Sequence, residues 1–70
     1  MKVKIKTDVV REHLIRRNIS QNKLAQIAEV STGYLSQVLN RQRCPGPAVR
    51  ARLMVALRIK DFYDLFERPE

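Results

Sequence analysis

Polar and apolar residues alternate at the start of the chain, where Val3 and Ile5 stand between Lys2, Lys4 and Lys6. A period of two is typical of a half-buried strand, here with lysines on its outer face. A single strand needs a partner, so three arrangements are open. Residues 1–6 pair with the C-terminal segment, pair with a second copy in a dimer, or form a disordered basic arm.

Helical spacing begins at Thr7, which we expect to cap the N-terminus of a first helix. Its apolar positions Val10 and Leu14 are four residues apart, and Asp8 stands in the first turn, where the helix dipole favours negative charge. Asn18 tolerates the left-handed backbone conformation in which many helices end, so the first helix is expected to end there.

Two short helices follow, and each is predicted to begin after a serine cap, Ser20 or Ser31. The apolar face of the second helix comprises Leu24, Ala25 and Ala28. The third helix directs Leu35, Val38 and Leu39 inward. Its outward positions are polar and uncharged: Thr32, Gly33, Ser36, Gln37 and Asn40.

Proline and glycine mark the loop over residues 41–47, and Pro47 suits the first position of a fourth helix. The apolar stripe of that helix is Val49, Leu53, Ala56 and Leu57. Asp61 is expected to cap a short last helix, whose apolar face is Phe62, Leu65 and Phe66. Residues 47–67 are therefore predicted to hold the C-terminal helices.

Residues 21–40 have the spacing of a helix-turn-helix, in which two short helices joined by a tight turn cross at a steep angle. The crossing needs a large apolar residue followed by a small one, which Leu24 and Ala25 supply. The motif also needs a small residue before the turn, an apolar residue within it and two apolar anchors under the later helix: Ala28, Val30, Leu35 and Val38. A bulkier side chain at Ala25 would push the helices apart, so alanine there favours the motif on steric grounds.

Residues 19–41 resemble the Cro/phage-repressor (Xre-type) family of helix-turn-helix regulators. The matching motif positions are Ser20, Gln21, Leu24, Ala25, Val30, Ser31 and Asn40. The likeness extends over residues 7–67, because the proline-started helix and the closing residues 59–66 are also similar to the family. It implies an all-α, five-helix λ-repressor-like fold with a short N-terminal strand or arm, in which the second and third helices form the DNA reader.

The same resemblance implies which residues contact DNA. The base contacts fall on the third helix, at Thr32, Gly33, Tyr34 and Gln37. A glutamine such as Gln37 can bond bidentately to adenine, with its amide on N6 and N7. The phosphate contacts fall at helix starts and beyond the third helix: Gln21, Asn22, Ser31, Ser36, Asn40, Arg41 and Arg43.

Three departures from the family pattern affect the motif. Glu29 stands where the turn usually has glycine, and a left-handed glutamate costs on the order of 1 kcal/mol. Leu14 and Leu39 stand where many members pair an arginine with a glutamate, an exchange that is often neutral or stabilising. Arg41 replaces a common glycine after the third helix and adds a charge that reaches toward phosphate.

Net charge narrows the class of partner, since 14 Lys+Arg and 7 Asp+Glu give +7 on a chain of 70 residues. Such a charge favours a polyanion, with nucleic acid first and an acidic membrane surface second. One histidine and a lone Cys44 cannot assemble a catalytic constellation or a structural zinc site, so we expect no enzyme, cofactor or metal. The cysteine usage and the lack of a membrane-spanning run predict a cytoplasmic, nucleoid-associated protein.

These features predict a sequence-specific regulator of transcription that binds double-stranded DNA. It would read the major groove with its third helix, as a homodimer on a palindromic operator. The alternative is an antitoxin-like or other protein-interaction module of the same fold, with a protein partner such as a toxin and DNA binding secondary. Tyr63 and Val55 are candidates for a dimer surface, as is the N-terminal strand.

Overall fold

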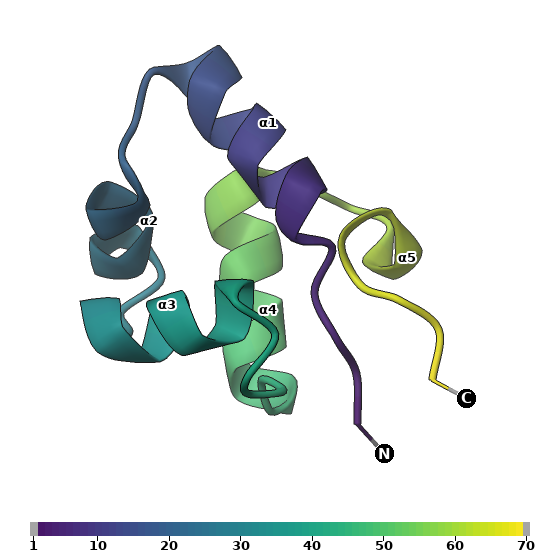
Figure 1. Cartoon of the computed structure of the whole chain (residues 1–70). Coiled ribbons are helices and arrows are strands. Elements are labelled where there is room, and N and C mark those ends of the chain that lie inside the picture. Colours follow the sequence, from purple (N-terminus) through teal and green to yellow (C-terminus); the bar gives the residue numbers. More distant parts are fainter. Residues whose placement is uncertain (1, 70) are drawn as a thin grey trace.

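The computed structural model describes residues 2–69, and over this part the chain forms five helices and an isolated antiparallel bridge (Figure 1). The helices are α1 (Thr7–Arg17), α2 (Gln21–Ile27), α3 (Thr32–Leu39), α4 (Pro47–Leu57) and α5 (Phe62–Leu65). In this view α2 and α3 lie together at the left, α4 stands in the middle and α5 lies at the right. The expected all-helical fold is confirmed for the described residues. Met1, the first residue of the expected arm, and Glu70 lie outside them.

The N-terminal segment lies along the C-terminal segment, the first of the three arrangements that the sequence leaves open. Ile5 forms the antiparallel bridge with Phe66. Two backbone hydrogen bonds flank the bridge, from Lys6 N to the Leu65 carbonyl at 2.8 Å and from Glu67 N to the Lys4 carbonyl at 2.9 Å. The alternation seen in the sequence places the Ile5 side chain in the core and the Lys4 side chain in solvent.

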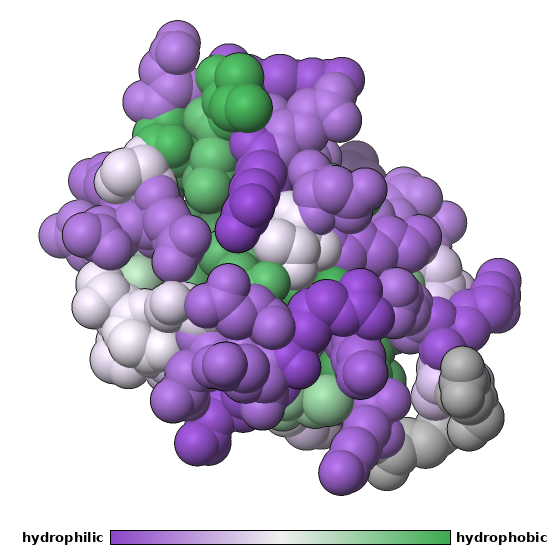
Figure 2. Space-filling model, in the orientation of Figure 1, coloured by the Kyte–Doolittle hydropathy of each residue, from purple (hydrophilic) through white to green (hydrophobic). Residues whose placement is uncertain are grey.

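A single hydrophobic cluster joins the N-terminal segment to the helices. Its buried members are Val3, Ile5, Val10, Leu14, Leu24, Ala25, Ala28, Leu35, Val38, Leu39, Leu53, Ala56, Leu57, Leu65 and Phe66. Leu14 and Leu39, which stand where many members of the resembled family have an ion pair, are both buried in this apolar cluster. Val49 and Phe62 are partly buried at the edge of the cluster. Hydrophilic residues cover most of the face in Figure 2, and hydrophobic ones gather over the end of α1 and its connection to α2.

The residues predicted to start α2, α3, α4 and α5 are found at the N-termini of those helices. The Ser20 hydroxyl accepts from Lys23 N at 3.0 Å, and the Ser31 hydroxyl accepts from Tyr34 N at 3.1 Å. Asp61 caps α5 by accepting from Tyr63 N at 3.0 Å, and Pro47 occupies the first turn of α4. Each cap satisfies an amide that a helix start leaves without a partner.

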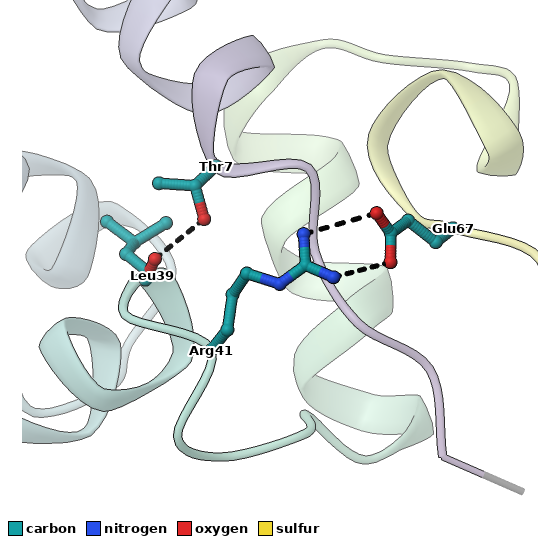
Figure 3. Close-up of polar contacts among 4 residues, drawn as sticks. All are labelled: Thr7, Leu39, Arg41 and Glu67. Carbon is teal, nitrogen blue, oxygen red and sulfur yellow. Dashed lines mark hydrogen bonds and ion pairs between the residues drawn. The ribbon is translucent and has the colours of Figure 1, made fainter.

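The predicted cap at Thr7 is wrong. Lys6 stands at the N-cap of α1 without a side-chain capping hydrogen bond, and Thr7 is the first helical residue. The Thr7 hydroxyl instead donates to the Leu39 carbonyl at 2.6 Å (Figure 3). Because the end of α3 packs beside the start of α1, this hydroxyl satisfies a carbonyl of another helix. The predicted end at Asn18 is confirmed, with φ at 55°.

Arg17 ties α1 to the end of α4. Its guanidinium donates to the Ala56 carbonyl at 2.9 Å and to the Leu57 carbonyl. The last carbonyls of a helix lack intrahelical partners and carry partial negative charge, so a guanidinium suits them. α4 then ends at Arg58, a left-handed residue with φ at 56° that the sequence does not predict.

Candidate nucleic-acid interface

The outer face of α3 presents uncharged polar groups to solvent. Thr32, Gly33 and Gln37 are exposed there, whereas Tyr34 and Ser36 are half-buried. A Cβ added to Gly33 would meet no heavy atom within 4 Å in the described part of the chain. Packing within the protein therefore leaves the space above Gly33 open for a close approach from outside.

The turn before α3 fixes how that face is presented. Glu29 has φ at 59°, the left-handed conformation that its position predicts, and Val30 N donates to the Ala25 carbonyl at 3.0 Å. Ala25 and Ala28 are each 1% exposed, so the two helices approach closely at their crossing. Exposed Ser31 then caps α3 and orients its first turn.

The start of α2 supplies a second polar edge. Gln21 is half-buried and Asn22 is exposed, and both stand in the first turn, where backbone amides point out of the helix. These residues lie on a different helix from Gln37. The packing of α2 on α3 sets the spacing between the two polar edges.

Arg41 binds the C-terminal segment through a bidentate ion pair with Glu67. Nη2 lies 2.7 Å from Oε1 and Nη1 lies 3.1 Å from Oε2 (Figure 3). Arg41 adopts the left-handed conformation with φ at 62°, which turns the chain back after α3. Glu67 is not among the residues to which the resemblance gives a role, and its pairing with Arg41 joins residues 26 positions apart in the sequence.

The ion pair shifts the pKa of both groups. The side-chain hydrogen bond with Arg41 lowers the pKa of Glu67 below its ordinary value, with further help from the charge of Arg41 and nearby lysines. The same bond raises the pKa of Arg41. Both side chains are close to half exposed, so solvent screens the pair.

Glu67 should therefore titrate below the ordinary glutamate value of about 4.3, and Arg41→Ala should return it toward that value. Because the folded pKa is depressed, the pair's contribution to stability is present above the unfolded pKa and is lost as pH falls through the folded pKa. A carbon NMR titration of the Glu67 carboxyl measures this. Arg16→Ala, which removes the exposed pair between Arg16 and Glu12, is the matched control and should leave Glu67 unchanged. An ordinary Glu67 pKa in the wild type would contradict the pairing.

Arg43, in the loop after α3, contacts two side chains of that helix. Its Nε donates to Gln37 Oε1 at 3.0 Å, and its Cζ lies 5.5 Å from the centroid of the Tyr34 ring. Of the residues that the resemblance assigns to DNA, the structure thus brings together Tyr34, Gln37 and Arg43. Arg41 points instead to Glu67.

The residues of α3 include no charged side chain, so the positive field at this face comes from its flanks. Lys23, Arg41 and Arg43 are exposed on the segments before and after α3. Exposed cations around a neutral polar face attract a polyanion without determining which bases are read.

Five helices in the described residues, with α2 and α3 joined by a tight turn, define a helix-turn-helix domain of the λ-repressor type. A helix-turn-helix family model matches residues 10–63. The chain therefore belongs to the Xre-type helix-turn-helix family. An uncharacterized HTH-type transcriptional regulator of Bacillus subtilis (strain 168), YvzC, is 37% identical over 65 residues, which cover 93% of this chain and 83% of the relative.

No solved structure gives a significant match to the chain. Across residues 2–69, none of the helices is both long enough and apolar enough to cross a membrane.

Proposed function

We propose that this chain is a sequence-specific, double-stranded-DNA-binding transcriptional regulator that reads the major groove with α3. The observation that carries the proposal is the exposed, uncharged outer face of α3, presented by a tight turn and flanked by cations. Family membership and the name of the Bacillus relative, an HTH-type transcriptional regulator, support the same function. A helix of this diameter fits the major groove, where each base pair presents a distinct pattern of donors and acceptors.

The residues divide into two roles. Thr32, Gly33, Tyr34 and Gln37 are proposed to face base edges. Phosphate contacts are proposed for polar groups and cations at the helix starts and in the loop: Gln21, Asn22, Ser31, Ser36, Asn40, Arg41 and Arg43. Phosphate contacts set register and affinity, and base contacts set sequence preference.

A homodimer on a palindromic operator is part of the proposal. One α3 contacts few base pairs, and two copies would place their reading helices about 34 Å apart, in successive major grooves. The apolar side chains that a dimer could bury include Val55, 78% exposed, and Tyr63, 37% exposed. We propose a cytoplasmic, nucleoid-associated location for such a regulator.

A protein-interaction module, antitoxin-like in its partnership, is the second candidate. The observation that favours it is an apolar groove against α4, where Val55, Ala51 and Ile27 line a surface beside the turn. Analytical ultracentrifugation of the purified chain measures its oligomeric state, and so shows whether two copies bury this groove against each other. A toxin-like partner predicts a monomer at micromolar concentration and a stable complex with the product of a neighbouring small gene.

Two substitutions test the division of roles. Gln37→Ala should weaken binding at the best site by about 1–3 kcal/mol and relax the preference at one base pair. Arg41→Ala should weaken binding to all sequences alike and reduce the slope of log K against log salt by about one. Fluorescence anisotropy with specific and random duplexes, at several salt concentrations, measures both effects.

Glu67→Gln is the companion variant for Arg41. It removes the carboxylate that competes with phosphate for this guanidinium, so binding to every sequence should strengthen.

Equal losses for Gln37→Ala and Arg41→Ala on specific and random DNA would contradict the roles assigned to Gln37 and Arg41.

A further inference from the structure

Tyr34, Gln37 and Arg43 form a cluster that joins the outer face of α3 to the following loop. Tyr34 and Gln37 are three residues apart on the helix, so they share a face. The Arg43 guanidinium contacts both, through the 3.0 Å bond to Gln37 Oε1 and through its approach of 5.5 Å to the Tyr34 ring. The separate roles assigned above, a base contact for Gln37 and a phosphate contact for Arg43, do not use this link.

The backbone after α3 holds Arg43 in place. Arg41 N donates to the Val38 carbonyl at 3.0 Å, and Gln42 N donates to the Gln37 carbonyl at 2.9 Å. These bonds fold the chain back over the last turn of α3, and Pro45, just beyond, is buried. Arg43 is therefore anchored on both sides, and it reaches Gln37 from a fixed starting point.

The bond to Arg43 orients the Gln37 amide. A glutamine amide has an accepting oxygen on one side and a donating NH2 group on the other. Bidentate contact with adenine uses both, since the oxygen accepts from N6 while the nitrogen donates to N7. Here the oxygen faces a guanidinium, which has five N–H donors and no acceptor. The bond occupies one of the two lone pairs of that oxygen and turns it toward Arg43, so the groups best placed for a base edge are donors, namely Gln37 Nε2 and the terminal nitrogens of Arg43.

We propose that Arg43 and Gln37 act as a pair that selects guanine over adenine: Arg43 orients the Gln37 amide and adds its own terminal donors at the base edge. The major-groove edge of guanine carries two acceptors, N7 and O6, whereas that of adenine carries one acceptor and one donor. Tyr34 supports the guanidinium through its ring face. This inference rests on the proposed reading of the major groove by α3. It replaces the adenine contact that the Gln37 side chain would favour on its own.

Selection from randomised duplexes tests the inference with four proteins: wild type, Gln37→Ala, Arg43→Ala and Arg43→Lys. Gln37→Ala identifies the base pair that Gln37 reads, and the wild type should select guanine there. Arg43→Ala should move that base to adenine and change the ratio of the two affinities by about tenfold or more, while other positions keep their bases. Arg43→Lys keeps the charge without the planar fork, so it should retain the salt slope and lose guanine preference.

Arg52→Ala is the matched control, because it removes the same charge from an exposed position on α4. It should leave the base preference unchanged. Adenine in the wild-type site would overturn the inference, as would an Arg43→Ala protein that binds all sequences more weakly with unchanged preference. In those cases the wild type still selects a sequence and the proposed function stands. A wild type that selects no sequence overturns the proposed function and this inference together.

Discussion

Phe66→Ala should destabilise the domain by about 3–5 kcal/mol, enough to leave much of it unfolded, because small domains are only marginally stable. Phe66 is 0% exposed, and its ring centroid lies 4.8 Å from that of Phe62. Its backbone also forms the bridge with Ile5, so the ring anchors both ends of the chain to the core. Urea denaturation followed by circular dichroism measures the loss.

The neighbouring aromatic residue provides the control. Tyr63 is 37% exposed and packs edge-on against Phe62 with centroids 5.2 Å apart. Tyr63→Ala should cost about 1 kcal/mol, since an exposed ring loses little burial. Similar losses for the two variants would contradict the placement of Phe66 at the centre of the core.

Ala25→Leu should cost up to about 3 kcal/mol by overpacking the crossing of α2 and α3. Ala25 is 1% exposed beside Leu24, which is 0% exposed, so three added carbon atoms would have to enter the packed interior. The protein that remains folded should bind DNA less specifically, because a wider crossing moves the start of α3 relative to that of α2. Thermal unfolding and duplex titration measure the two effects.

Gln26→Leu is the matched variant, since Gln26 is the exposed next residue on α2. It should change stability by less than about 0.5 kcal/mol, in the range of ordinary surface substitutions. An Ala25→Leu protein as stable as Gln26→Leu would show that the crossing has room, against the steric reading of the motif.

Local rules account for the parts of the fold that the sequence predicts. The caps at Ser20, Ser31 and Asp61 join atoms two or three residues apart, so a short stretch of sequence contains both partners. The left-handed ends at Asn18 and Glu29 likewise depend on one residue and its turn. Apolar spacing locates the core because helices bury one face.

Contacts between distant residues account for what the sequence does not predict. Thr7 and Leu39 are 32 positions apart, Arg17 and Ala56 are 39 apart, and Arg41 and Glu67 are 26 apart. Each contact depends on how whole helices pack, which periodicity leaves open. In the first case the Thr7 hydroxyl, expected to cap its own helix, instead donates to a carbonyl on another helix.

In the candidate interface, too, some features follow from local sequence and others depend on contacts between segments. The exposed polar face of α3 follows from spacing alone, and the structure places Thr32, Gly33 and Gln37 on it as expected. The contact between Gln37 and Arg43 could not be read from the sequence, because it needs the left-handed residue at Arg41 to return the chain onto α3. In the proposed function, the charge of +7 and the neutral face of α3 would serve different purposes, affinity and base selection.

Equilibrium binding to a selected duplex and to random duplexes, each over a range of salt concentrations, tests whether α3 reads the base sequence. We expect a selected site with two half-sites about 34 Å apart, bound at least about a thousandfold more tightly than random DNA. Both affinities should fall steeply with salt. Steep salt dependence with equal affinity for every sequence would contradict this expectation, since the cations would then bind DNA without a reading helix.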